Sequence, residues 1–324
     1  MRRAIEALTD ELRRLRTAGV KNVAVSDEAM AALRAVIGAS RPAAALPAAP
    51  APPARRQAED AAAARPAVTS MPVTAPAAAP TKAAKPASAK SALPEGVTPP
   101  PSAPPQFQLP EGDKAARWAA LRELVLNDPV CAAHVRAGKK VVFGVGALDA
   151  RIMFVGEAPG AEEEMQGEPF VGPAGQLLTK MIQGMGLKRE DVYIGNIMNW
   201  RPEIPMVGGG AQIGNRAPVE EEMRYCLPYL RAQIEVVNPD LVVALGATAA
   251  QGLLGFGAFK ALGEVRGKWH EFAGKPLMVT YHPSYILRNQ SNRSKRMIWE
   301  DLLKVMERAP LPISDRQRAY FIDK

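Results

Sequence analysis

The chain has 324 residues, of which 47% are hydrophobic and 23% are charged, and its formal net charge is +8 at pH 7. Its 2 cysteines are too few for a disulfide scaffold, which excludes a small, stapled secreted domain. The sequence contains neither an apolar run of membrane-spanning length nor the apolar stretch of a secretory signal, so we expect a cytoplasmic protein without membrane attachment.

Residues 1–40 have the hydrophobic spacing of helices. Apolar side chains recur every three or four residues from Ile5 to Leu15 and again from Met30 to Ile37. Two such helices bury little surface alone, so we expect a helical segment that docks a protein partner or associates with a second copy. A weakly folded tail without a partner is the alternative.

Residues 41–106 form a segment of unusual composition, rich in alanine and proline. It holds 16 of the chain's 30 prolines, together with 7 basic and 3 acidic residues. Proline removes backbone donors and alanine offers little to bury, which predicts a disordered, extended tether. Its positive charge either raises the local affinity for a polyanion or only keeps the linker solvated.

From residue 107 onward, short apolar runs alternate with amphipathic helical patterns. This alternation predicts an α/β domain over 107–310, followed by a tail over 311–324. The simplest architecture is a three-layer α/β/α sandwich around a central, mostly parallel four-stranded sheet. The expected strands lie at 151–155, 191–194, 241–245 and 277–281, and the expected helices at 173–186, 219–237, 247–254 and 293–307.

Three of the predicted strands end next to a polar side chain: Glu157, Asn196 and His282. Ligands of open parallel sheets bind beyond the carboxyl ends of the strands. A carboxylate, an amide and an imidazole that meet there can recognise and activate a small polar ring. Each residue also has an ordinary structural explanation, namely a helix cap, a turn and a backbone hydrogen bond. Their joint position favours a site.

The loop after the first strand adds an aromatic candidate. Phe170 stands in a segment framed by glycine and proline, with Gly160 before it and Gly175 after it. An aromatic ring in such a loop can stack on a nucleic-acid base. The alternative is an ordinary core phenylalanine.

These residues carry a resemblance to a known family. Residues 156–178 (starting GEAPG) resemble the first motif of the family 4 uracil-DNA glycosylases, and residues 192–202 resemble that family's second strand. NRAP at 215–218, VRGKW at 265–269 and HPSYILRN at 282–289 are also similar to family motifs. The matches occur in order over most of the folded domain, which is far more specific than a lone glycine motif.

The resemblance implies an α/β/α enzyme that flips uracil out of DNA and hydrolyses its N-glycosidic bond, which leaves an abasic site for base-excision repair. By motif position, Phe170 would stack on the base and Asn196 would read its amide edge. His282 would donate to a uracil oxygen as negative charge develops there.

The same motifs imply roles for further residues. Glu157 would orient or activate water or stabilise the positively charged sugar, and Glu163 would crowd out the methyl group of thymine. Ser284, Leu287 and Arg288 would contact DNA, with Leu287 probing the duplex and Arg288 free to reach a phosphate.

The family's four-iron four-sulfur cluster is not expected here. The positions of its four cysteine ligands read Asp128, Cys131, Trp200 and Cys226 in this chain. Two thiolates are too few to hold such a cluster, so the two cysteines are interpreted as remnants and we predict no metal cofactor.

Two departures leave other functions open. The missing ligands favour a catalytically impaired DNA-binding relative as the main alternative, and a hydrolase of free nucleosides is a weaker one. A glycine-rich insertion at 206–214 also predicts a mobile loop, which leaves the preference for single- or double-stranded DNA undecided.

Overall fold

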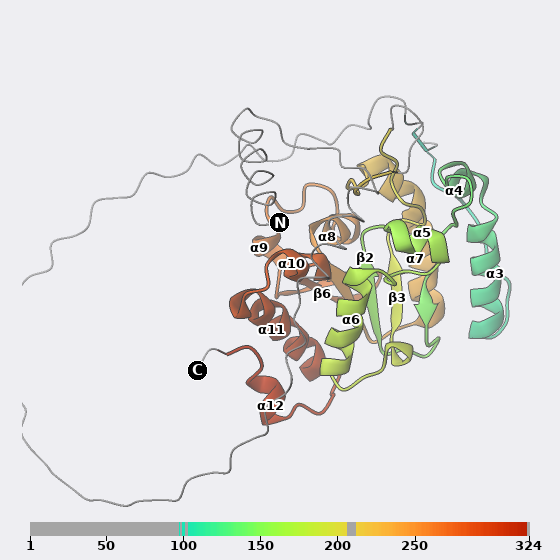
Figure 1. The fold of residues 1–324 in the computed structure, drawn as a ribbon. Coiled ribbons are helices and arrows are strands. Elements are labelled where there is room, and N and C mark those ends of the chain that lie inside the picture. Colours follow the sequence, from blue (N-terminus) through green and yellow to red (C-terminus); the bar gives the residue numbers. More distant parts are fainter. Residues whose placement is uncertain (1–96, 98, 101–102, 206–211, 323–324) are drawn as a thin grey trace, which may run out of the picture. The chain divides into compact units, whose positions relative to one another are not determined.

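The protein is described by a computed structural model that covers residues 97, 99–100, 103–205 and 212–322 (Figure 1). The predicted helices of residues 1–40, nearly all of the predicted linker and most of the glycine-rich insertion lie outside the described residues.

The centre of the domain is a sheet with the strand order β1-β3-β2-β4-β6-β5. Its four inner strands are parallel, which confirms the predicted α/β class and the four strands read from the sequence. Their register pairs Phe154 with Ile194 and with Val243. The inner strands are β2 (Ile152–Gly156), β3 (Tyr193–Asn196), β4 (Leu241–Leu245) and β6 (Lys275–Thr280).

Two antiparallel edge strands enlarge the predicted sheet. β1 (Val145–Gly146) pairs with β3, and β5 (Trp269–Phe272) forms a hairpin with β6. Ala273 and Gly274 make the hairpin turn with φ angles of 50° and 71°, the left-handed conformation that two-residue hairpin turns require. The sequence pattern did not reveal these strands, because β1 has only two residues and β5 is mostly half-exposed.

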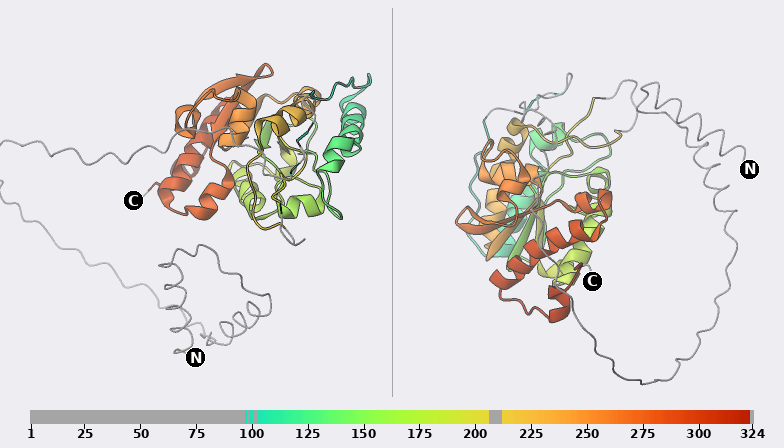
Figure 2. Two further views of the ribbon diagram at one scale, coloured as in Figure 1. Left: turned by 90° about the horizontal axis from the view of Figure 1, so that it is seen from above. Right: turned by 90° about the vertical axis from the view of Figure 1, so that its left-hand side faces the viewer.

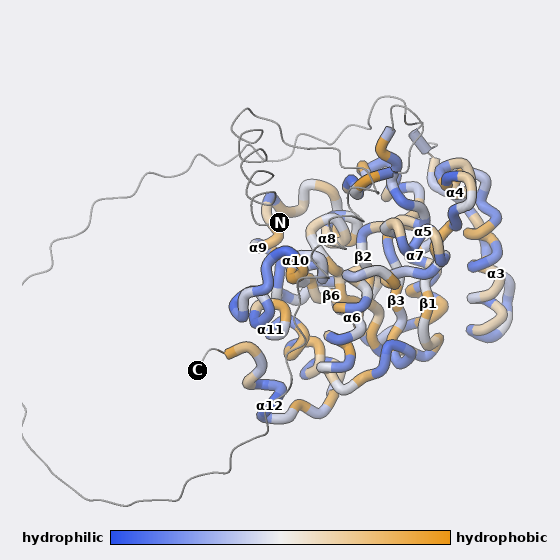
Figure 3. Tube along the Cα trace, viewed as in Figure 1, coloured by the Kyte–Doolittle hydropathy of each residue, from blue (hydrophilic) through white to orange (hydrophobic). Residues whose placement is uncertain are grey.

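The inner strands bury both faces because consecutive side chains point to opposite sides of a sheet. In β2, Met153 and Val155 belong to one hydrophobic core, whereas Ile152 and Phe154 belong to the other. The hydropathy of the chain follows this arrangement, with apolar strands inside and polar helix faces outside (Figure 3).

Helices cover both faces of the sheet (Figures 1 and 2), and the four helices predicted from the sequence are confirmed nearly to the residue. Within the described ranges, no helix is both long and apolar enough to cross a membrane. One core contains residues of α3 (Lys114–Leu126), α7 (Glu220–Val237) and α8 (Ala247–Leu254); the other contains residues of α6 (Pro173–Gly184), α10 (Pro283–Arg288) and α11 (Asn292–Arg308). The short helices are α4 (Pro129–Ala133), α5 (Ala161–Gln166), η1 (Arg189–Asp191), α9 (Leu262–Val265) and α12 (Asp315–Arg318).

The segment that follows α11 packs back onto the domain. The Trp299 indole donates a hydrogen bond of 2.6 Å to the carbonyl of Gln317, and the Gln317 amide donates to the carbonyl of Gly184 at 2.8 Å. The ring of Tyr320 lies 5.1 Å from that of Trp299. The described part of the predicted tail therefore packs against the end of α6 and the middle of α11.

Candidate active site

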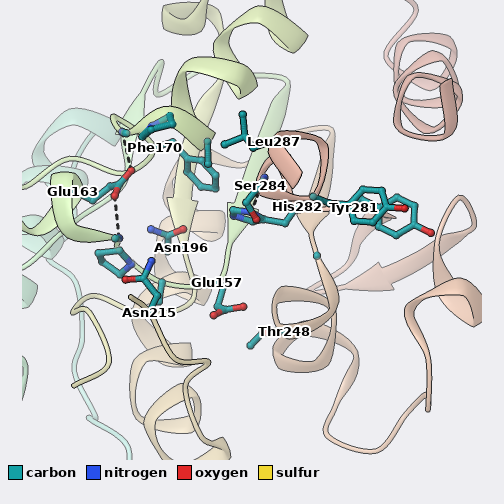
Figure 4. Close-up of a pocket in the computed structure, with 18 of the residues that line it drawn as sticks. Glu157, Glu163, Phe170, Asn196, Asn215, Thr248, Tyr281, His282, Ser284 and Leu287 are labelled. Carbon is teal, nitrogen blue, oxygen red and sulfur yellow. Dashed lines mark hydrogen bonds between the residues drawn. The ribbon is translucent and has the colours of Figure 1, made fainter. Parts of the chain in front are cut away.

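A cavity of about 700 Å³ opens at the carboxyl ends of the parallel strands (Figure 4). The chain turns sharply after β2, β3 and β6, and each turn delivers side chains to this cavity. The structure thus brings together the residues that the sequence proposed for catalysis, uracil binding and DNA contact. They are Glu157, Glu163, Phe170, Asn196, His282, Ser284, Leu287 and Arg288.

Asn196 ends β3 and exposes only 6% of its surface. Its Oδ1 atom is buried and has no hydrogen-bond partner among the described residues, although a buried amide normally has one. A side chain at Gly156 would place its Cβ 2.3 Å from this oxygen and 2.5 Å from Cζ of Phe170. Glycine at position 156 therefore keeps the space around the amide open.

Phe170 is buried and adopts a φ of 55°, which is rare for a residue with a bulky side chain. The neighbouring turn enforces this conformation, since a Cβ at Gly175 would lie 1.8 Å from the Phe170 carbonyl oxygen. The ring centroid lies 5.6 Å from that of His282, at an interplanar angle of 32°. The strained loop thus presents the aromatic ring to the cavity.

Glu163 fastens this loop to α5. Its carboxylate accepts hydrogen bonds from the backbone N–H groups of Gly160, Val171 and Gly172, at 3.0, 3.1 and 3.0 Å. Sequence reasoning expected Glu163 only as a wall of the base pocket and missed this role. The signal was its place three residues after the glycine that begins the helix, which is the acidic position of a capping box.

His282 follows β6 and caps α10. Its Nδ1 accepts the backbone N–H of Ser284 at 3.2 Å and lies 2.8 Å from the Ser284 hydroxyl. Burial, together with the nearby positive charge of Arg288, lowers the pKa of His282 to about 4. The imidazole is therefore neutral at pH 7, and with Nδ1 acting as acceptor its proton resides on Nε2.

Glu157 follows β2, and the pKa of its carboxyl group is raised. Burial is the main cause, and a hydrogen bond from Thr248 offsets only part of its effect. Thr248 was not identified from the sequence because it begins an otherwise small and apolar helix. Gly246, with a φ of 96°, makes the turn before α8 that places Thr248 in the cavity wall beside Glu157 (Figure 4). Glu157 is not a helix cap, because α5 starts after Gly160.

Leu287 and Arg288 lie at the rim of the cavity, in the last turn of α10. Leu287 is 41% exposed. An Arg288 Nη atom lies 3.3 Å from the hydroxyl of Ser284. Arg288 is thereby linked through Ser284 to the imidazole of His282.

Two further lining residues come from the NRAP motif. Asn215 accepts a hydrogen bond of 2.8 Å from Arg201, while Arg216 binds both carboxylate oxygens of Glu222 at 2.7 and 2.8 Å. Glu222 is almost completely buried, so the pair is shielded from solvent. The motif was noticed in the sequence, but these contacts depend on side chains brought from other elements.

All four positions that correspond to the cluster ligands hold buried side chains. Cys131 and Cys226 are buried free thiols, and hydrogen bonding with Cys226 and burial raise the pKa of Cys131. Asp128 accepts the backbone N–H of Cys131 at 2.7 Å and the hydroxyls of Tyr225 and Tyr229 at 3.0 and 2.6 Å. Burial opposes ionisation of Asp128, but these donors outweigh it and lower its pKa.

Trp200 stands at the remaining one of the four positions that correspond to cluster ligands. Its indole is 1% exposed and stacks on His134 at a centroid distance of 4.7 Å. Among the described residues, no group of three or more histidine, cysteine or acidic side chains is arranged to hold a metal ion. The residues present therefore do not fit a four-iron four-sulfur cluster, which requires four thiolates where this chain has two.

Comparison with known proteins agrees with this geometry. The model of the Uracil DNA glycosylase superfamily matches residues 143–303. A type-4 uracil-DNA glycosylase of Thermotoga maritima is 44% identical over 183 residues, which cover 56% of this chain and 89% of that protein. A type-4 uracil-DNA glycosylase of Pyrobaculum aerophilum is 40% identical over 181 residues, which cover 54% of this chain and 87% of that protein. A type-4 uracil-DNA glycosylase of Archaeoglobus fulgidus is 43% identical over 150 residues, which cover 44% of this chain and 70% of that protein. The chain belongs to the type-4 branch of the uracil-DNA glycosylase superfamily.

Proposed function

We propose that this protein removes uracil from DNA by hydrolysing the bond between the base and the deoxyribose, which leaves an abasic site. The observation that carries the proposal is the buried amide of Asn196, which lines the cavity and whose Oδ1 has no partner among the described residues. The type-4 uracil-DNA glycosylases to which the chain is similar support the same activity. A stacked base cannot reach this cavity, so the nucleotide must first rotate out of the strand.

In the proposed complex, Asn196 reads the Watson–Crick edge of the flipped base. Uracil offers an N3–H donor and an O4 acceptor, which the oxygen and the NH₂ of a carboxamide complement. Cytosine offers the reverse pattern and leaves the buried amide unpaired, which is the strong form of discrimination. Phe170 stacks on the ring, and the wall at Glu163 crowds the methyl group that distinguishes thymine.

His282 acts as a neutral hydrogen-bond donor in this scheme. As the glycosidic bond breaks, its electrons leave with the uracil and negative charge builds on the ring oxygens. The Nε2–H of His282 donates to O2, and a donor placed where charge develops is worth several kcal/mol in a buried site. The Ser284 contacts to Nδ1 hold the ring in the required tautomer.

Glu157 serves the sugar side of the reaction. Water attacks C1′ as the bond between C1′ and the base breaks. The carboxylate orients this water, takes up the proton that the water loses, and stabilises the positive charge that spreads over the deoxyribose. At the rim, Leu287 enters the gap left by the flipped nucleotide, while Arg288 and Ser284 contact the phosphate backbone.

We propose that this chemistry needs no iron–sulfur cluster. Trp200 and Asp128 stand at two of the four ligand positions. The support for the proposal is that Trp200 is packed in the core and that Asp128 accepts hydrogen bonds from three donors. Purified protein is expected to contain no stoichiometric iron and to show no broad visible absorbance. Iron at about four atoms per chain, together with that absorbance, would contradict the proposal.

The activity is tested with labelled oligonucleotides that carry one uracil, either single-stranded or paired with G or A, and with alkali to reveal abasic sites. The wild type is expected to release uracil, and Glu157→Gln, which keeps the size of the side chain, is expected to lower the single-turnover rate at least about 100-fold. Binding of DNA without excision would instead favour a catalytically impaired relative. Excision from free deoxyuridine but not from DNA would favour a nucleoside hydrolase.

The remaining proposals concern residues outside the described part of the chain. Residues 1–40 would dock a protein partner or a second copy, and residues 41–106 would act as the tether, which raises the effective concentration of the domain near DNA. A cytoplasmic location is proposed with them.

A further inference from the structure

A second hollow of about 520 Å³ lies beside α5, lined by residues of α3 and α4 and by residues from 135–145 and 166–168. We call it the basic groove, because its charged lining consists of four cations and one carboxylate. The cations are Arg122, Arg136, Lys139 and Lys140, and the carboxylate is Glu168.

The charges of these cations are not neutralised by nearby acids. Within the described residues, none of the four takes part in an ion pair, and their contacts are with neutral groups. Arg136 binds the Gln212 side chain, the Lys139 ammonium contacts the Met165 sulfur, and Lys140 donates to the Gln166 carbonyl at 3.4 Å. Charged donors with neutral partners remain available to an anionic ligand.

The uracil cavity, by contrast, supplies little positive charge. Its lining includes three glutamates, and of its two arginines Arg216 is already bound to Glu222. Among the described residues that line this cavity, only Arg288 is left to attract a phosphate. Since the affinity of proteins for DNA depends mainly on cations that neutralise phosphates, a substrate strand needs positive charge from outside the cavity.

The basic groove lies next to the uracil cavity, at the other end of α5. α5 connects the two sites, because Glu162 and Glu163 near its start line the cavity while Gln166 at its end lines the groove. Six helical residues span about 9 Å, so the cavity and the groove are close enough for one DNA strand to reach both. Glu163 and Ser284 lie on opposite sides of the cavity (Figure 4), so the groove continues away from Arg288.

We propose that the basic groove binds the phosphate backbone of the strand whose base is flipped into the cavity. This inference rests on the proposed function, and it adds a second, sequence-independent DNA contact. It assigns to Lys139 and Lys140 a role in holding the strand, without a role in the chemistry.

The test measures binding of a labelled single-stranded oligonucleotide without uracil at increasing NaCl concentration. In Lys139→Gln/Lys140→Gln, the slope of log Kd against log [NaCl] is expected to fall by about 1.4, since each phosphate contact on a single strand contributes about 0.7. Lys139→Arg/Lys140→Arg is expected to keep the wild-type slope. The charge-matched control is Lys180→Gln/Lys188→Gln, which removes two exposed cations on and after α6 and is expected to leave the slope unchanged.

Cleavage of two substrates separates this proposal from the proposed function. The glutamine double variant is expected to retain wild-type kcat/KM on a uracil trinucleotide, which is too short to reach the groove, and to lose about tenfold on a long oligonucleotide. The proposal would be wrong if the glutamine double variant kept the wild-type salt slope, or if the slope fell equally in the α6 control. It would also be wrong if the glutamine double variant lost activity equally on both substrates. If the wild type cleaved neither substrate, the proposed function would fail, while the salt slope would still decide whether the groove binds DNA.

Discussion

Asn196→Ala is expected to lower kcat/KM for uracil excision by about 10³- to 10⁴-fold while the protein stays folded. The variant would lose the two hydrogen bonds that we propose between Asn196 and the base inside a buried site, where each is worth about 2 kcal/mol or more in the transition state. The methyl side chain of alanine also leaves no polar atom unpaired in the free protein. Single-turnover cleavage of an oligonucleotide with one uracil measures the change.

Asn199 offers a matched control for this prediction. It lies three residues further along, is also buried and also has an unpartnered Oδ1 within the described part of the chain, but it is not among the residues that line the cavity. Its NH₂ group donates to the Val142 carbonyl at 3.0 Å. Asn199→Ala should therefore lower the free energy of unfolding by about 1–3 kcal/mol and leave kcat/KM nearly unchanged. Equal losses of activity in both variants would show that Asn196 acts only through folding.

His282→Ala is expected to lower kcat by about 10²- to 10³-fold, because it removes the side chain that we propose as the donor to the developing negative charge. Ser284→Ala should have a smaller effect, since the backbone N–H of residue 284 still binds Nδ1. Rapid-quench kinetics at saturating enzyme would report the chemical step directly.

The pH dependence distinguishes the neutral imidazole from a charged one. Because the pKa of His282 is about 4, its protonation state is constant between about pH 5 and 8 and contributes no titration there. The wild-type rate should instead fall on the acid side as Glu157 takes up a proton, above its ordinary pKa because burial raises it. Glu157→Gln should remove that acid limb. A titration near pH 6.5 that disappears in His282→Ala would contradict the neutral assignment.

Much of the domain followed from the pattern of its sequence. The four inner strands were found because each contains a short, mostly apolar run followed by glycine or a polar residue, which is typical of strands buried on both faces. The helix at 219–237 was found from its long amphipathic period, and the structure places it at Glu220–Val237. The edge strands were missed, since their pairing depends on neighbours that are distant in the sequence or on a turn with a weak signal.

The sequence by itself determined that the chain is an α/β protein of the uracil-DNA glycosylase superfamily and named the polar residues at its strand ends. Those conclusions depend on local periodicity and on motifs, both of which are written along the chain. The tertiary structure decided the partners of those residues: the backbone donors bound by Glu163, the tautomer of His282 and the contact of Thr248 with Glu157. It also decided that Trp200 and Asp128 are packed and hydrogen-bonded where the family's ligands would stand, and that four cations gather beside α5. Such contacts join residues from separate elements, so their geometry exists only once the sheet and its helices have packed.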